Sequence, residues 1–125
     1  MNIVMLGAGY VGLVSGACFS ELGFNVTCLD NDVEKIDNLK KGILPIYEPG
    51  LEVLVKKNIS TGRLSFNIEK KEYIKKADAI FIAVGTPARR GDGHADLSFV
   101  FQVAEEISSY LAGYTVIVTK STVPV

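Results

Sequence analysis

The sequence predicts an α/β fold in which a doubly wound parallel sheet carries helices on both faces. Short apolar runs alternate along the chain with longer segments of helical periodicity. The short runs are apolar at nearly every position, which is typical of parallel strands buried on both sides. A chain of 125 residues, of which 48% are hydrophobic, can fill one core, so we expect a single domain over residues 1–125.

The chain is expected to open with a strand, a helix and a second strand. The strands are the β-branched-rich runs at 2–6 (NIVML) and 25–29 (NVTCL). The helix between them covers residues 10–22 and ends at Gly23. Spacing near the helical period places its apolar side at Val11, Val14, Cys18 and Leu22.

Polar and charged segments dominate the next part of the chain. We expect a polar helix from about Asp32 to Lys41, and a short strand over 63–67 (RLSFN) is compatible with the pattern. Residues 69–78 (EKKEYIKKAD) predict a charged helix with little buried surface. A further helix precedes the 63–67 strand, with Pro49 in its first turn and an apolar stripe formed by Leu51, Leu54 and Val55.

The most apolar run of the chain lies at 79–84 (AIFIAV) and predicts a central strand. A loop over 86–98 follows, and the last strand is expected at 114–119 (YTVIVT). Between them a helix covers 98–112, with one side formed by Val100, Val103, Ala104, Ile107 and Leu111.

Three glycines stand where the first strand meets the first helix, in the pattern G-x-G-x-x-G. Gly7 can take the tight turn, Gly9 allows a diphosphate to approach the backbone, and Gly12 lets the helix pack closely on the strand. The amides at the helix start, near Tyr10, Val11 and Gly12, would then face the phosphate oxygens. The pattern therefore favours a Rossmann-type dinucleotide site over a simple close helix–strand crossing.

An acidic residue, Asp30, ends the second strand and lies 23 residues (30 − 7) after the first glycine. A carboxylate there can accept hydrogen bonds from the hydroxyls of the adenosine ribose, and it would repel a 2′-phosphate. The sequence therefore predicts NAD rather than NADP as the cofactor. The competing interpretation is a solvated aspartate with no ligand.

Two loops follow later strands at the same edge of the sheet, where ligands of open α/β sheets bind. The candidate contacts toward the ribose and nicotinamide are Gly85, Thr86 and Pro87 in the first loop and Ser121 and Thr122 in the second. Composition alone leaves an alternative for the threonines, which can instead bond their own backbone.

Composition narrows the function classes further. A formal net charge of −1 gives no overall attraction to nucleic acid or to an anionic membrane. Neither a transmembrane-length apolar stretch nor a signal peptide is evident, so we predict a cytoplasmic protein. The single histidine, His94, and the spacing of the two cysteines predict no metal site, and both cysteines are expected to be buried, reduced thiols.

Four stretches together resemble the N-terminal domain of the UDP-glucose 6-dehydrogenase family, which includes GDP-mannose dehydrogenases. The stretches are GAGYVGLVSGACFSELGFNVTCLDND, GILPIYEPGLEVLV, VGTPARRGDGHADLS and KSTVPV, and the resemblance covers essentially the whole chain. It implies an enzyme that oxidises the C6 alcohol of UDP-glucose to UDP-glucuronate with two NAD and a catalytic cysteine, a step of polysaccharide precursor synthesis. It also implies cofactor contacts at Gly7, Gly9, Val11, Gly12, Asp30, Lys35, Thr86 and Thr122.

The resemblance places the family's catalytic cysteine in a second, sugar-binding domain beyond residue 125. Cys18 and Cys28 match helix-core and strand positions, so we predict no catalytic residue here and an inactive fragment of a longer, homodimeric enzyme. The nucleotide-sugar substrate would bind through that other part. Two alternatives stay open at this point: a non-catalytic nucleotide-sensing domain of the same fold, and another NAD-dependent hydroxy-acid or sugar dehydrogenase.

Overall fold

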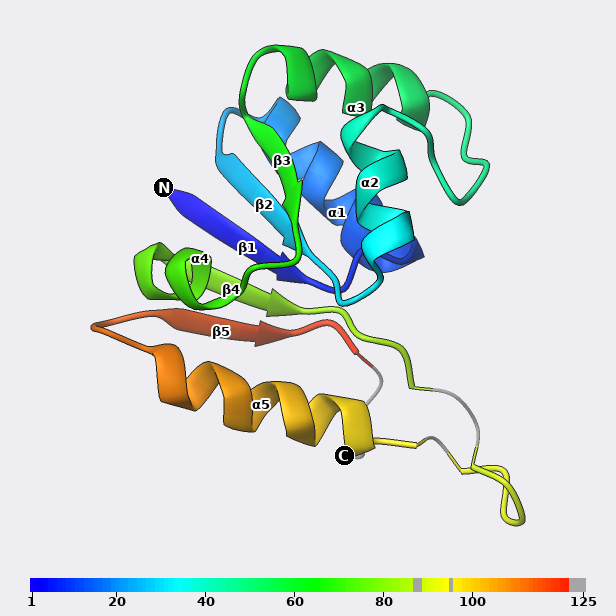
Figure 1. Cartoon of the computed structure of the whole chain (residues 1–125), viewed down its shortest axis with the longest axis vertical. Helices are drawn as coiled ribbons and strands as arrows, with labels where there is room; N and C mark the ends of the chain where they lie inside the picture. Colours follow the sequence, from blue (N-terminus) through cyan, green and yellow to red (C-terminus); the bar gives the residue numbers. More distant parts are fainter. Residues whose placement is uncertain (87–88, 95, 122–125) are drawn as a thin grey trace.

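A five-stranded sheet forms the centre of the molecule, as the computed structural model shows over residues 1–86, 89–94 and 96–121 (Figure 1). Its strand order is β3-β2-β1-β4-β5, and every neighbouring pair is parallel. The strands are β1 (Asn2–Leu6), β2 (Asn25–Leu29), β3 (Leu64–Asn67), β4 (Ala79–Ile82) and β5 (Val116–Thr119). The predicted α/β class with a parallel sheet is thereby confirmed.

Five helices cover the two faces of this sheet within the described residues. One face carries α1, α2 and α3, and the other carries α4 and α5 (Figure 1). The helices are α1 (Tyr10–Glu21), α2 (Val33–Lys40), α3 (Leu51–Ser60), α4 (Lys71–Lys76) and α5 (Ser98–Tyr110). Successive side chains of a strand point to opposite faces, so β1 supplies both layers: Ile3 and Met5 to the first, Val4 and Leu6 to the second.

The predicted apolar side of α1 is wrong at three of its four residues, and only Val14 packs against the core. Val11, Cys18 and Leu22 are exposed, so the expectation of a buried Cys18 also fails. The helix instead buries its small residues and one leucine, namely Gly12, Leu13, Gly16, Ala17 and Ser20. At Gly16 a Cβ would lie 2.8 Å from Sγ of Cys28 on β2, so α1 lies too close to the sheet at this position for a larger side chain.

Other differences concern the ends of elements. Pro49 precedes α3, whose N-cap is Gly50, and the strands at 79–82 and 116–119 are shorter than predicted. The run at 79–84 forms β4, which lies beside β1 rather than at the middle of the sheet. On α5, Val100 and Ile107 are buried as expected, whereas Ala104 and Leu111 are exposed. The order of strands brings the ends of β1, β2 and β4 together at one edge.

Candidate nucleotide-binding site

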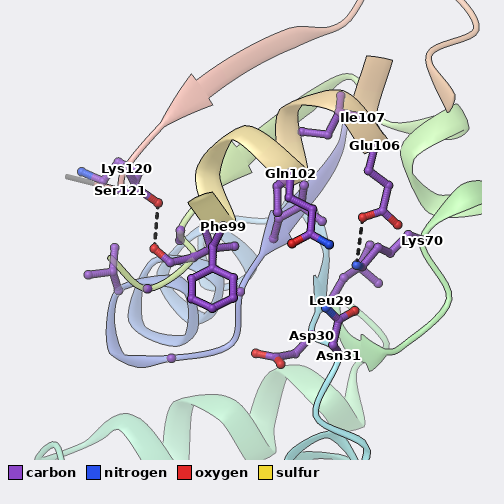
Figure 2. Close-up of a pocket in the computed structure, with 18 of the residues that line it drawn as sticks. Leu29, Asp30, Asn31, Lys70, Phe99, Gln102, Glu106, Ile107, Lys120 and Ser121 are labelled. Carbon is purple, nitrogen blue, oxygen red and sulfur yellow. Dashed lines mark hydrogen bonds and ion pairs between the residues drawn. The ribbon is translucent and has the colours of Figure 1, made fainter. Parts of the chain in front are cut away.

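A cleft of about 1090 Å³ opens at the carboxyl ends of the strands, between the glycine-rich turn and α5 (Figure 2). This volume is slightly above the ~300–1,000 Å³ that small-molecule sites occupy. The strand order reverses here, since β1 is flanked by β2 on one side and β4 on the other. Nine of the predicted contact residues line it: Gly7, Gly9, Tyr10, Val11, Asp30, Lys35, Gly85, Thr86 and Ser121.

The remaining three predicted contacts are placed differently. Gly12 is buried under the turn, where a Cβ would lie 1.9 Å from the carbonyl oxygen of Gly7. Pro87 and Thr122 lie outside the described residues. Gly12 therefore acts on the cleft through the packing of α1.

The turn after β1 is shaped by its glycines. Gly7 has a φ of 104°, which L side chains rarely adopt, and a Cβ there would lie 2.4 Å from the carbonyl oxygen of Ala83. Its N–H donates to the carbonyl of Leu29 at 2.8 Å, which joins the turn to the end of β2. A Cβ on Gly9, in contrast, would meet no atom within 4 Å and would project into open space. This open space is what a diphosphate lying on the turn requires.

The start of α1 presents free backbone amides to this space. Gly9 is the N-cap and has no side chain that could cap the helix. The first N–H groups of a helix have no partner within it, and they carry the positive end of the helix dipole. The amides at Tyr10 and Val11 therefore suit an anionic group such as a diphosphate.

Asp30 is fixed at the end of β2 by three donors. Its Oδ2 accepts from the N–H of Ala8 at 2.9 Å and from Nζ of Lys35 at 3.3 Å, and its Oδ1 accepts from the N–H of Asp32 at 3.0 Å. Burial raises the pKa of Asp30, but these donors outweigh it, so the pKa lies below its ordinary value. Oδ1 keeps an acceptor position for a ribose hydroxyl.

Lys35 reaches Asp30 from the first turn of α2. The helix is capped by Asp32, whose Oδ1 accepts from the N–H of Lys35 at 3.0 Å. The side chain of Lys35 is 28% exposed and lines the cleft beside the carboxylate. Its ammonium group is therefore accessible from the cleft, and its contact with the adenosine ribose stays a prediction.

The wall opposite the turn comes from α5 and the residue before α4, and the motifs did not reveal it. Figure 2 shows Phe99, Gln102 and Glu106 directed toward the cleft, and Nζ of Lys70 lies 3.1 Å from Oε2 of Glu106. The α5 side chains are three and four positions apart, so helical spacing could have grouped them. The pairing of Glu106 with Lys70, 36 residues away, follows only from the tertiary fold.

Ser121 ties the two predicted loops together. Its Oγ donates to the carbonyl of Val84 at 2.9 Å, and its N–H donates to the carbonyl of Ile82 at 3.0 Å. The serine hydroxyl is thus bonded to the backbone of the other loop, 37 positions away, rather than to its own. Gly85, Thr86 and Ser121 all line the cleft.

The comparisons with known proteins agree with this geometry. Residues 1–125 match the UDP-glucose/GDP-mannose dehydrogenase family, NAD binding domain. The chain belongs to this family. All of residues 1–125 correspond to the family's NAD-binding domain, and the cofactor of the family is NAD.

Relatives of this NAD-binding domain are close in sequence. The chain is 59% identical over 125 residues to the UDP-glucose 6-dehydrogenase of Rhizobium meliloti, and 53% identical over 125 residues to the UDP-glucose 6-dehydrogenase YwqF of Bacillus subtilis. All of this chain is covered in both matches, but only 29% and 28% of the relatives. The chain thus spans less than a third of these proteins.

Solved structures show the same domain. A GDP-mannose dehydrogenase from Pseudomonas aeruginosa superposes with a TM-score of 0.93 at 38% identity, and a UDP-glucose dehydrogenase from Pyrobaculum islandicum with 0.92 at 40%. Each match covers 98% of this chain and 29% of the other. The predicted family and Rossmann-type fold are confirmed. Over the described residues, none of the helices is long and apolar enough to cross a bilayer.

Proposed function

We propose that this chain binds NAD in the cleft and serves as the cofactor-binding domain of an enzyme that oxidises UDP-glucose to UDP-glucuronate. The observation that carries the proposal is the pairing of open space over Gly9 with a fixed carboxylate, Asp30, in one cleft. The names of the relatives supply the substrate class. When bound, NAD accepts hydride from the sugar alcohol.

Each group of residues has a distinct task in this proposal. The amides at Gly9, Tyr10 and Val11 receive the diphosphate, and Asp30 with Lys35 holds the adenosine ribose. The loop at Gly85 and Thr86 and the one at Ser121 line the path toward the nicotinamide; Pro87 and Thr122 remain predicted contacts. Gly12 contributes by seating α1 against the turn.

The other parts of the proposal concern the whole enzyme. We place nucleotide-sugar binding and the catalytic cysteine in the larger portion of the relatives that this domain does not match. Among the described residues that line the cleft there is no cysteine, and burial raises the pKa of the Cys28 thiol to about 12. Residues 1–125 alone should therefore form no NADH from NAD and UDP-glucose. A cytoplasmic location and a homodimeric full-length enzyme belong to the same proposal.

Titration of NADH into the chain, followed by nicotinamide fluorescence, tests the binding step. We expect saturable binding of NADH at one site. NADPH should bind at least ~10-fold more weakly, because it loses the ribose hydrogen bond to Asp30 and its 2′-phosphate is repelled by this carboxylate. Each ~1.4 kcal/mol of binding free energy is a factor of ten in affinity. Asp30→Asn should weaken NADH binding and narrow the difference between the two cofactors. Asp37→Asn, an exposed position on α2, is the matched control. Equal affinities for NADH and NADPH would contradict the role of Asp30.

A further inference from the structure

The segment YEPGL contacts the glycine-rich turn directly. Tyr10, the first residue of α1, lines the cleft, and its phenol donates a hydrogen bond to Oε2 of Glu48 at 2.9 Å. The two residues are 38 positions apart. Tyr10 is 52% exposed and Glu48 is half-buried, so the bond is made at the rim of the cleft. The resemblance singled out this segment without giving it a task.

A tight turn fixes the backbone of Glu48. The carbonyl of Glu48 accepts from the N–H of Leu51 at 3.1 Å, which closes a four-residue turn. Gly50 has φ 83° and ψ −14°, the values that the third position of a type II turn requires, and Pro49 occupies the second position, where proline is favoured. The sequence Glu-Pro-Gly-Leu at 48–51 therefore has the residues that a type II turn favours.

Both sides of this turn are anchored in the core. Leu51, which ends the turn, is 4% exposed, and Leu44 and Ile46, which precede it, pack against the same core cluster. A chain held on both sides has little freedom to move Glu48 away from Tyr10. The carboxylate is thus presented to the phenol by rigid structure.

The protonation states suit a lasting bond. Hydrogen bonding to Glu48, its negative charge, and slight burial raise the pKa of Tyr10 above its ordinary value. The phenol therefore stays a neutral donor throughout the neutral range. Without its acceptor, a tyrosine side chain that is half exposed would sample several rotamers, and binding a cofactor against it would cost that freedom.

We propose that Glu48 is a positioning residue for the cofactor: it holds the Tyr10 ring as a fixed wall beside the α1 amides. The inference rests on the proposed NAD site and adds a residue to it. The carboxylate itself faces the phenol. Glu48 favours cofactor binding through its acceptor oxygen and not through its charge, because a negative charge near a diphosphate is unfavourable.

Affinity for NADH across a double-mutant cycle tests the proposal on the chain of residues 1–125. Glu48→Ala and Tyr10→Phe should each weaken NADH binding by about threefold to tenfold, the effect of one hydrogen bond. The double variant should bind no more weakly than either single one, since both remove the same contact. Glu48→Gln keeps an acceptor oxygen without the negative charge and should bind NADH at least as tightly as the unmodified chain does.

Two comparisons keep the result interpretable. Glu52→Ala removes an exposed carboxylate in the first turn of α3, where it pairs with Lys56, and should leave NADH affinity unchanged. Thermal unfolding by circular dichroism reports whether a variant folds. If Glu48→Ala does not fold, the NADH affinities of Tyr10→Phe and Glu48→Gln test the proposal.

The two proposals fail in different ways. Absence of saturable NADH binding by the unmodified chain would overturn the proposed function itself. Three outcomes would overturn the positioning role alone. Saturable binding of NADH could be unchanged in Tyr10→Phe, or it could weaken additively in the double variant. It could also be lost or weakened in Glu48→Gln.

Discussion

At the scale of single residues, Asp30 is a carboxylate that three donors hold at the edge of the cleft. Donors from the glycine-rich turn, from the residue two positions on, and from Lys35 hold it in place and keep it ionised. The sequence identified Asp30 from its position at a strand end. Its bond to Ala8, which joins two strand ends, became visible only with the fold.

The lowered pKa of Asp30 predicts a pH dependence of stability. Because the folded-state pKa lies below the unfolded value of ~3.9, the ionised carboxylate stabilises the fold above that pH, and this contribution is lost as pH falls through the folded pKa. Asp30→Asn should lower the free energy of unfolding by about 1 kcal/mol at neutral pH, with the difference shrinking in acid. Urea unfolding at neutral and at acidic pH measures both values. An undiminished difference in acid would contradict this assignment.

The two thiols should differ sharply in reactivity. Cys28 is fully buried on β2, and burial raises its thiol pKa to about 12, whereas Cys18 is exposed on α1. A thiol reagent such as dithionitrobenzoate should therefore modify one cysteine in the native chain and the second only on unfolding. Cys18→Ser should leave the native chain unreactive. Rapid modification of native Cys18→Ser would show that β2 is not buried as described.

At the scale of elements, α1 determines the geometry of the cleft because it packs unusually close to the sheet. The sequence located this helix within a residue of its ends but assigned its buried side to the wrong residues. Apolarity favoured Val11 and Leu22, whereas close packing selects Gly12, Gly16 and Ala17. Hydrophobic periodicity cannot detect a helix–sheet contact that is made by glycine and alanine residues. The opposite wall on α5 was missed as a site because its pairing with Lys70 is tertiary.

Two glycine substitutions on this element should separate folding from binding. Gly12→Ala would place a Cβ 1.9 Å from a backbone oxygen and should cost about 1–3 kcal/mol of stability, or more, as α1 is displaced. Gly9→Ala meets no atom within 4 Å and has an extended backbone, so stability should change by less than ~1 kcal/mol. Its methyl group would nevertheless occupy the diphosphate position and weaken NADH binding.

Thermal unfolding and NADH titration of both variants provide the comparison. A stable Gly9→Ala chain that binds NADH normally would show that the space over Gly9 is not where the diphosphate lies.

At the scale of the whole molecule, the parallel sheet and the family were predictable because alternating elements and four motifs agree over the full chain. The strand order was not predicted, since no local pattern encodes which strands become neighbours. That order places β1 between β2 and β4, and so brings Asp30, the glycine-rich turn and the loop at Gly85 to one cleft. The chain corresponds to less than a third of each relative, and the family match identifies this part as the NAD-binding domain.

The most direct test of the central claim is a two-dimensional ¹⁵N–¹H spectrum of the chain, recorded while NAD is added. The account predicts progressive shifts of the amide signals of Gly9, Tyr10 and Val11, together with those around Asp30, and little change on β3 or the outer side of α3. Shifts confined to other surfaces, or a spectrum unaltered by NAD, would contradict the placement of the cofactor at the start of α1.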